Sequence, residues 1–222
     1  MKKCKSAILS ANPAQIDYVY TPAQIREIAS ITDFLPGIYR QEDVESGKLA
    51  DVEVLFSTWG MVKLDDALLD RMPALKAVFY AAGATDYFAR PLFARGIRVF
   101  SAWRANAIPV AEFCVAQIIL GLKGYFRASR SLTGPEFFNH KLAGRGVYGE
   151  TVALIGAGAI SNMVQKLLQA YRVNVVVVPS RREKRTVSLE EVFRTAMVIS
   201  NHLPDRDDNV GVHRLRRVSS QS

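Results

Sequence analysis

The chain has 222 residues, of which 49% are hydrophobic, enough for a genuine core in one large domain or two small ones. Its net charge is +8, but the basic clusters carry no interleaved aromatic residues, which argues against nucleic acid as a partner. The two cysteines, Cys4 and Cys114, are far apart and outside any metal-ligand spacing, which argues against a metal site or a structural disulfide.

No segment of the sequence is typical of a membrane protein or a secreted one. The longest apolar run, residues 114–122, contains Gln117 and is followed by Lys123, so it is short for a membrane span. The apolar stretch behind the basic N-terminus ends at Pro13, before a signal peptide would be complete. We therefore expect a cytoplasmic protein without membrane association.

Short apolar runs alternate with amphipathic ones along the first half of the chain. Thr21, Pro22 and Gln24 form a capping box that opens a helix, and Asp65 and Asp66 open another that ends near Arg71. A further short helix precedes Gly96. The strands expected here are residues 6–10, 52–57, 77–81 and 97–101.

The second half repeats this alternation after a break at Ile108 and Pro109. Pro109 suits the first turn of an apolar helix over residues 110–125, which we expect to be buried. Further helices are expected over residues 159–171 and from a cap at Ser188 to Arg194. The expected strands are residues 151–155, 173–178 and 197–200. Alternating strands and helices indicate an α/β fold with doubly wound parallel sheets.

The segment GAGAIS, residues 156–161, is typical of a dinucleotide-binding turn, because it follows a strand and opens a helix. Gly156 permits the tight turn and Gly158 lets the backbone approach a pyrophosphate at the helix N-terminus. Ser161 replaces the third glycine of the pattern, and its small size predicts a slight cost. The alternative is a strand–turn–helix joint that happens to be rich in glycine.

The end of the next strand lacks the acidic residue that usually binds the ribose hydroxyls. Pro179 occupies that position, and Ser180, Arg181 and Arg182 follow it. Arginine matches phosphate geometry, so a bound dinucleotide is expected to be NADP rather than NAD. Drift in a degraded site is the open alternative.

Three more segments, together with the glycine turn, carry a family resemblance: LKAVFYAAGATD at residues 75–86, NAIPVAE at 106–112 and SNHLPDRDDNVGV at 200–212. In this order and spacing they resemble the D-isomer-specific 2-hydroxyacid dehydrogenase family over about residues 52–211. The resemblance implies a flavodoxin-like substrate domain, residues 1–108. It also implies that residues 109–212 form an incomplete Rossmann domain, which binds NAD or NADP and begins with an interdomain helix. A homodimer formed through this domain is implied as well.

The resemblance also implies binding residues for each ligand. Ala82 and Gly83 would lie near the substrate carboxylate and Asn106 near the nicotinamide. The residues implied beside the cofactor are Ala159 and Ile160, through their amides, and His202, Leu203 and Pro204, in addition to Gly156, Gly158, Ser180, Arg181 and Arg182.

No catalytic residue is carried over from the family, whose members use an arginine, a glutamate and a histidine on later parts of the cofactor domain. His140, His202 and His213 do not match that histidine, and Arg214, Arg216 and Arg217 lie in the wrong context for that arginine. Residues 213–222, HRLRRVSSQS, form an aberrant basic tail without a strand pattern. A shifted reading frame after Val212 would produce such a tail, a hypothesis that the encoding DNA tests.

Three functions remain open at this point. The first is an NAD(P)-dependent oxidoreductase acting on a small 2-hydroxy or 2-keto acid, inactive as a truncated chain because the acid/base and substrate-anchoring groups are absent. The second is a non-catalytic dinucleotide-binding or interaction remnant. The third is a product that aggregates, because half a Rossmann sheet leaves an open edge and an uncovered apolar face.

Overall fold

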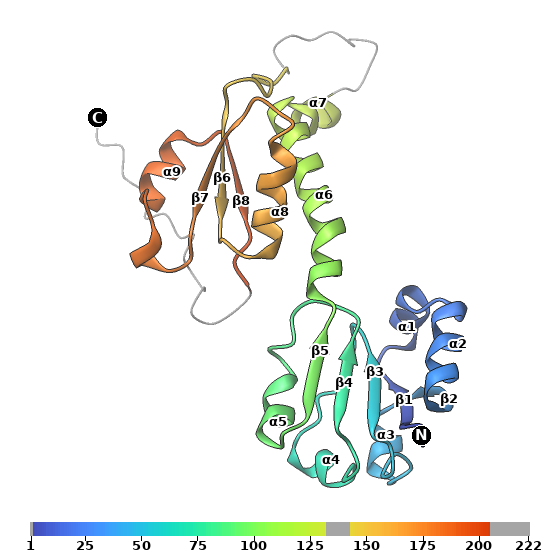
Figure 1. Ribbon diagram of the computed structural model, residues 1–222. Helices are drawn as coiled ribbons and strands as arrows, with labels where there is room; N and C mark the ends of the chain where they lie inside the picture. Colours follow the sequence, from blue (N-terminus) through green and yellow to red (C-terminus); the bar gives the residue numbers. More distant parts are fainter. Residues whose placement is uncertain (1, 132–142, 205–222) are drawn as a thin grey trace. The chain divides into compact units, whose positions relative to one another are not determined.

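The computed structural model describes residues 2–131 and 143–204 (Figure 1). The chain divides into two compact units, Met1–Asn106 and Ala107–Ser222. The basic tail predicted at residues 213–222, the predicted end of the second domain at residue 212, and His140 and His213 lie outside the described residues.

The first unit is built on a parallel sheet. Its strands, in the order β2-β1-β3-β4-β5, show the flavodoxin-like arrangement in which the first connection runs one way and the later ones run the other. This confirms the predicted α/β fold class. The strands are β1 (Lys5–Leu9), β2 (Asp33–Tyr39), β3 (Val54–Ser57), β4 (Ala77–Tyr80) and β5 (Arg98–Ser101).

Helices cover the two faces of this sheet unequally. Because the β1–β2 connection runs opposite to the others, its helices lie on one face and the later helices on the other. On the face that carries the β1–β2 helices, the rings of Phe56, Phe79 and Phe100 stack across β3, β4 and β5. Phe79 and Phe100 remain 39% and 46% exposed there. The helices are α1 (Pro13–Val19) and α2 (Pro22–Ile31), then α3 (Gln41–Glu45), α4 (Asp66–Asp70) and α5 (Ala89–Ala94).

The start of α2 is confirmed in detail. The Thr21 hydroxyl accepts a hydrogen bond from the Gln24 amide, and the Gln24 side chain accepts one from the Thr21 amide. Both bonds of a capping box are therefore present, and Pro22 occupies the first helical position, where its missing N–H costs nothing.

Helices α1 and α3 and strand β2 were not predicted from the sequence. Strand β2 contains Pro36 and Gly37, which are unfavourable in a central strand. Pro36 and Gly37 are tolerated because β2 is an edge strand, which pairs only with β1 in the described sheet. Pro13, taken as the end of an apolar stretch, instead opens α1.

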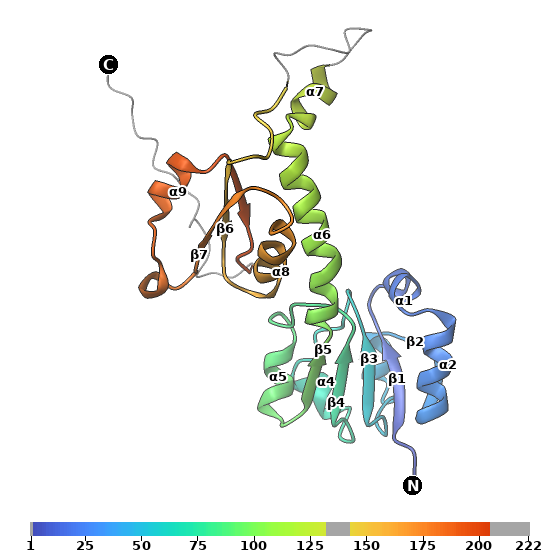
Figure 2. The same ribbon diagram turned by 45° about the horizontal axis from the view of Figure 1, so that its top comes forward.

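The second unit packs helices on both faces of a smaller parallel sheet, ordered β7-β6-β8 in the described residues. Figures 1 and 2 show α8 and α6 on one face and α9 on the other, as the two core clusters require. The strands are β6 (Thr151–Ile155), β7 (Asn174–Val178) and β8 (Val198–Asn201). The helices are α6 (Trp103–Leu122), α7 (Tyr125–Ser131), α8 (Ala159–Leu168) and α9 (Leu189–Thr195), with a short 3-10 helix, η2 (Arg182–Lys184).

The predicted start of the long apolar helix was wrong. Helix α6 begins at Trp103, so Pro109 lies inside it and leaves the carbonyl of Ala105 without its usual helical donor. By length and composition alone, α6 is also sufficient to cross a membrane, contrary to the expectation from residues 114–122. Its residues Ile118 and Leu122 are instead buried in the second core, as expected for a core helix.

Ser161 occupies the close contact between α8 and the sheet. Its side chain is completely buried, and its hydroxyl has no hydrogen-bond partner in the described part of the chain. Serine therefore fits in size, as expected, but its buried hydroxyl carries a polar cost that its size does not indicate.

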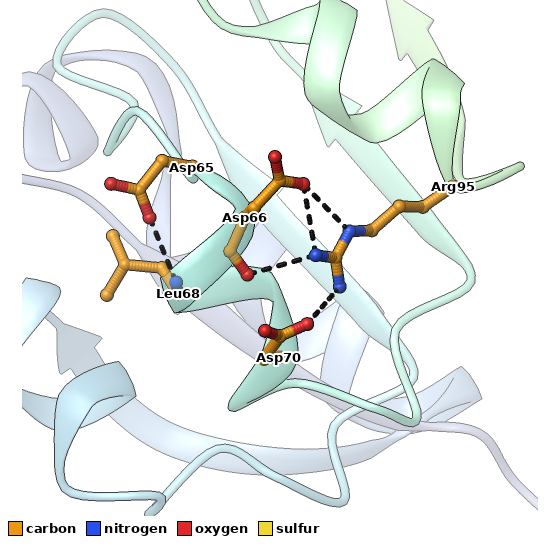
Figure 3. A network of polar contacts seen from close by, with 5 residues as sticks. All are labelled: Asp65, Asp66, Leu68, Asp70 and Arg95. Carbon is orange, nitrogen blue, oxygen red and sulfur yellow. Dashed lines mark hydrogen bonds and ion pairs between the residues drawn. The ribbon is translucent and has the colours of Figure 1, made fainter.

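A surface network joins α5 to α4 (Figure 3). The guanidinium of Arg95, just after α5, lies 2.6 Å from an Asp70 oxygen and 3.0 Å from Asp66 Oδ1. Such exposed ion pairs add little stability. The Asp65 carboxylate has a different role, because it accepts a 2.9 Å hydrogen bond from the Leu68 amide and caps α4.

The first prediction concerns this cap. Asp65→Ala should lower the free energy of unfolding by about 1 kcal/mol, because it leaves a first-turn N–H of α4 without its acceptor. Asp65→Asn keeps an acceptor oxygen and should stay close to wild type in urea denaturation. Equal losses in both variants would assign the effect to charge and contradict the capping role.

The second prediction concerns Ser161. Ser161→Ala should raise the free energy of unfolding by about 1 kcal/mol, because it removes a buried hydroxyl that has no partner among the described residues and improves helix propensity. Ser161→Gly removes the same hydroxyl but costs helix propensity, so it should lie below Ser161→Ala. A destabilised Ser161→Ala chain in the same denaturation assay would show that the hydroxyl is satisfied.

Candidate functional site

A hollow of about 300 Å³ lies at the carboxyl ends of β6, β7 and β8 in the second unit. The chain leaves β6 toward β7 on one side and later returns to β8 on the other, so this is the point where the strand order reverses. Open α/β sheets bind their ligands at such a point. Its lining residues are Gly156, Ala157, Gly158, Pro179, Ser180, Arg181, Lys184, His202, Leu203 and Pro204.

Main-chain hydrogen bonds fasten the three strand ends together. The Gly156 amide donates to the Val178 carbonyl at 2.8 Å, and the His202 amide donates to the Ile155 carbonyl at 2.7 Å. The walls of the hollow are therefore extensions of the sheet, and the hydrogen bonds fix the distances between them.

The glycine turn meets two different requirements. Gly156 has φ +103°, and a Cβ there would lie 3.0 Å from the His202 carbonyl oxygen. Any other residue would be strained and would collide with backbone. A Cβ on Gly158 would meet no described residue within 4 Å, so the described part of the chain leaves room for a ligand beside it.

Helix α8 begins at this turn and directs its first-turn amides toward the turn's open side. Gly158 is the N-cap, and no side chain from residues 2–131 or 143–204 caps the helix there. The amides of Ala159, Ile160 and Ser161 lie in the first turn, where a helix offers them no internal acceptor. A pyrophosphate fits this place, since the amides and the helix dipole both favour an anion.

Two cations line the opposite wall. Arg181 and Lys184 are both exposed and lie in the loop after β7, beside Ser180. Arg182, which was also predicted to lie at the cofactor, begins η2 and is not among the lining residues. Lys184, three residues after Arg181, lines the hollow instead. Lys184 belongs to the basic cluster in the sequence, but the family resemblance did not indicate it as a cofactor residue.

His202 adds no positive charge to the hollow at neutral pH. Burial lowers the pKa of its imidazole, so the neutral form dominates. Its Nε2 is buried and has no hydrogen-bond partner among the described residues. The cationic character of the hollow therefore comes from Arg181 and Lys184.

The predicted substrate residues lie together in the first unit. The Ser101 hydroxyl contacts the carbonyl oxygens of Ala82 and Gly83 at 2.8 and 2.6 Å, which fixes the turn after β4. A Cβ on Gly83 would lie 3.1 Å from Nδ2 of Asn106. Ser101 was not predicted as a site residue, because one serine at a strand end gives no sequence signal.

The chain matches known proteins in both sequence and fold. Residues 115–219 match the family model "D-isomer specific 2-hydroxyacid dehydrogenase, NAD binding domain". The D-3-phosphoglycerate dehydrogenase of Methanocaldococcus jannaschii is 25% identical over 207 residues, which cover 89% of this chain and 38% of that protein. The chain thus spans well under half the length of this curated relative.

Solved structures show the same fold over most of the chain. An acyclic imino acid reductase in complex with NADPH and D-Arg has a TM-score of 0.72 at 19% identity, covering 92% of this chain and 67% of that one. The NAD+-bound 3-phosphoglycerate dehydrogenase of Entamoeba histolytica has a TM-score of 0.65 at 19% identity, covering 93% and 65%. The solved structures therefore show the fold of the chain, and residues 115–219 are similar to the NAD-binding domain of the D-isomer-specific 2-hydroxyacid dehydrogenase family.

Proposed function

We propose that the second unit holds a nicotinamide dinucleotide in the hollow at the ends of β6, β7 and β8, as part of a 2-hydroxyacid dehydrogenase. The single observation that carries this proposal is the glycine turn. Gly156 is required by its positive φ and the nearby backbone of His202, while no described residue fills the space beside Gly158 or caps the N-terminus of α8 with its side chain. This combination suits close approach by a pyrophosphate.

NADP is the better fit of the two dinucleotides. An acid at the position of Pro179 would accept hydrogen bonds from the ribose hydroxyls and repel a 2′-phosphate, and this chain has none there. Ser180, Arg181 and Lys184 line that wall instead, and both cations are exposed and can turn toward a phosphate. The imino acid reductase that shares this fold was solved with NADPH.

The substrate is a small 2-hydroxy or 2-keto acid. The turn of Ala82 and Gly83, held by Ser101 and flanked by Asn106, suits a carboxylate because backbone amides are good anion ligands. When bound, the nicotinamide accepts or delivers a hydride at the carbon that bears the hydroxyl or keto oxygen. The chain's own residues would bind and orient both molecules.

The 222-residue chain by itself is inactive in this proposal. None of its described residues matches the arginine, glutamate and histidine that the family resemblance assigns to catalysis, and His202 lies at the cofactor wall. A cytoplasmic location is consistent with the burial of Ala111, Ile118 and Leu122 of α6 in the second core. The dimer that the family resemblance implies would involve this cofactor unit.

The third prediction tests cofactor choice by calorimetric titration. The wild-type chain should bind NADP at least about tenfold more tightly than NAD, because a 2′-phosphate gains charge-assisted hydrogen bonds. Arg181→Ala and Lys184→Ala should each lower NADP affinity by about tenfold and leave NAD affinity nearly unchanged. Gly156→Ala is the control that should abolish binding of both. Tighter binding of NAD by the wild type would refute the NADP preference.

The fourth prediction concerns turnover. The chain should bind NADPH but show no oxidation of it with glyoxylate, pyruvate or hydroxypyruvate above the rate of a Gly156→Ala control, measured by absorbance at the NADPH band. A missing positioned acid/base alone costs about 10²–10⁴ in rate. Oxidation that depends on both the keto acid and Gly156 would show that the chain holds a complete catalytic site.

A further inference from the structure

The four cations that follow β7 do not all face the hollow. Arg181 and Lys184 line it, and Arg182 does not. Arg185 differs from the other three because it is half-buried, whereas they are exposed. A cation that leaves water needs partners, so the surroundings of Arg185 reveal its role.

The guanidinium of Arg185 returns to the start of its own loop. Its Nε donates a 2.9 Å hydrogen bond to the Pro179 carbonyl, and its Nη2 donates a 2.9 Å hydrogen bond to the Ser180 carbonyl. The fork of one guanidinium thus holds two consecutive peptide carbonyls. Because these donors are already engaged inside the loop, Arg185 is poorly placed to serve as a phosphate ligand.

The main chain of the loop makes short-range bonds of its own. The Lys184 amide donates to the Arg181 carbonyl and the Arg185 amide donates to the Arg182 carbonyl, each at 3.1 Å. These bonds form η2, but they do not reach back to the strand. The side chain of Arg185 does reach back, and it closes the ring from residue 185 to residues 179 and 180.

We propose that Arg185 is a positioning residue for cofactor selection: its guanidinium closes the loop after β7 so that Ser180, Arg181 and Lys184 face the hollow. This inference rests on the proposed binding of a dinucleotide there. With the two carbonyls tied, the loop is ordered before the ligand arrives, and the phosphate-facing groups lose less conformational freedom on binding. Without the hydrogen bonds from Arg185, Arg181 and Lys184 keep their charges but are no longer held facing the hollow.

Two substitutions separate this tether from simple charge. Arg185→Lys keeps the positive charge and loses the fork, because an ammonium cannot reproduce the planar geometry that spans both carbonyls. Arg182→Met removes a positive charge from the same loop and leaves the fork intact. A charge effect should appear in the second variant, and a tether effect should appear in the first.

The experiment measures the affinities of NADP and NAD for the wild type, Arg185→Lys, Arg185→Met and Arg182→Met by calorimetry. Both Arg185 variants should lose about five- to tenfold in NADP affinity, the worth of about one hydrogen bond, with less than about a twofold change for NAD. Arg182→Met should stay within about twofold of wild type for both cofactors. In the free proteins, amide hydrogen exchange at residues 180–185 should be faster in Arg185→Lys and Arg185→Met than in the wild type. In Arg182→Met it should match the wild type.

The possible failures are distinguishable. A wild-type chain that binds neither dinucleotide overturns the proposed function. A wild-type chain that prefers NADP, with Arg185→Lys showing the same preference and the same exchange rates, overturns only the role of Arg185. An Arg182→Met chain that loses as much NADP affinity as Arg185→Met would also overturn it, because charge alone would then account for the effect.

Discussion

The candidate site depends on one close approach of two backbones. The turn after β6 passes so near the chain leaving β8 that a side chain at Gly156 would lie 3.0 Å from the His202 carbonyl oxygen. This contact needs a residue that tolerates φ +103° and has no Cβ. It brings the start of α8 and the end of β8 to the same hollow, and the Gly156 amide ties the end of β7 to them through Val178. The first-turn amides of α8, the loop with Arg181 and Lys184, and Leu203 and Pro204 thus border one hollow.

The electrostatics of the hollow divide between fixed and adjustable parts. The amides of α8 are fixed by the helix and favour an anion regardless of pH. Arg181 and Lys184 are exposed side chains, whose positions depend on the loop that carries them. His202 is neutral because burial lowers the pKa of its imidazole, and it contributes shape rather than charge. The net charge of the chain says little about this site, since the useful cations are two residues on one short loop.

Local patterns predicted the elements that local forces determine. The capping box at Thr21 and the cap at Asp65 begin helices where the sequence indicated, and the strand, turn and helix around Gly156 lie as predicted. Edge strand β2 was missed because its tolerance of Pro36 depends on its place in the sheet, which the local sequence does not contain. Pro109 was misplaced for a related reason, since the packing of α6 outweighs one lost helical hydrogen bond. The sequence could not show that the Ser161 hydroxyl has no hydrogen-bond partner among the described residues, or that the Arg185 guanidinium binds the carbonyls of its own loop. Both facts depend on which atoms surround the side chain in three dimensions.

Nuclear magnetic resonance gives the most direct test that a dinucleotide occupies this hollow. In a titration of the isotope-labelled chain with NADP, the amide signals of Gly156, Gly158, Ala159 and Arg181 should shift together along one saturable curve, because the proposed complex places these residues beside the pyrophosphate and the ribose phosphate. Signals of the first-unit core, such as Leu55 and Val78, should move little. Saturation without shifts at the glycine turn, or shifts confined to the first unit, would contradict the proposed site.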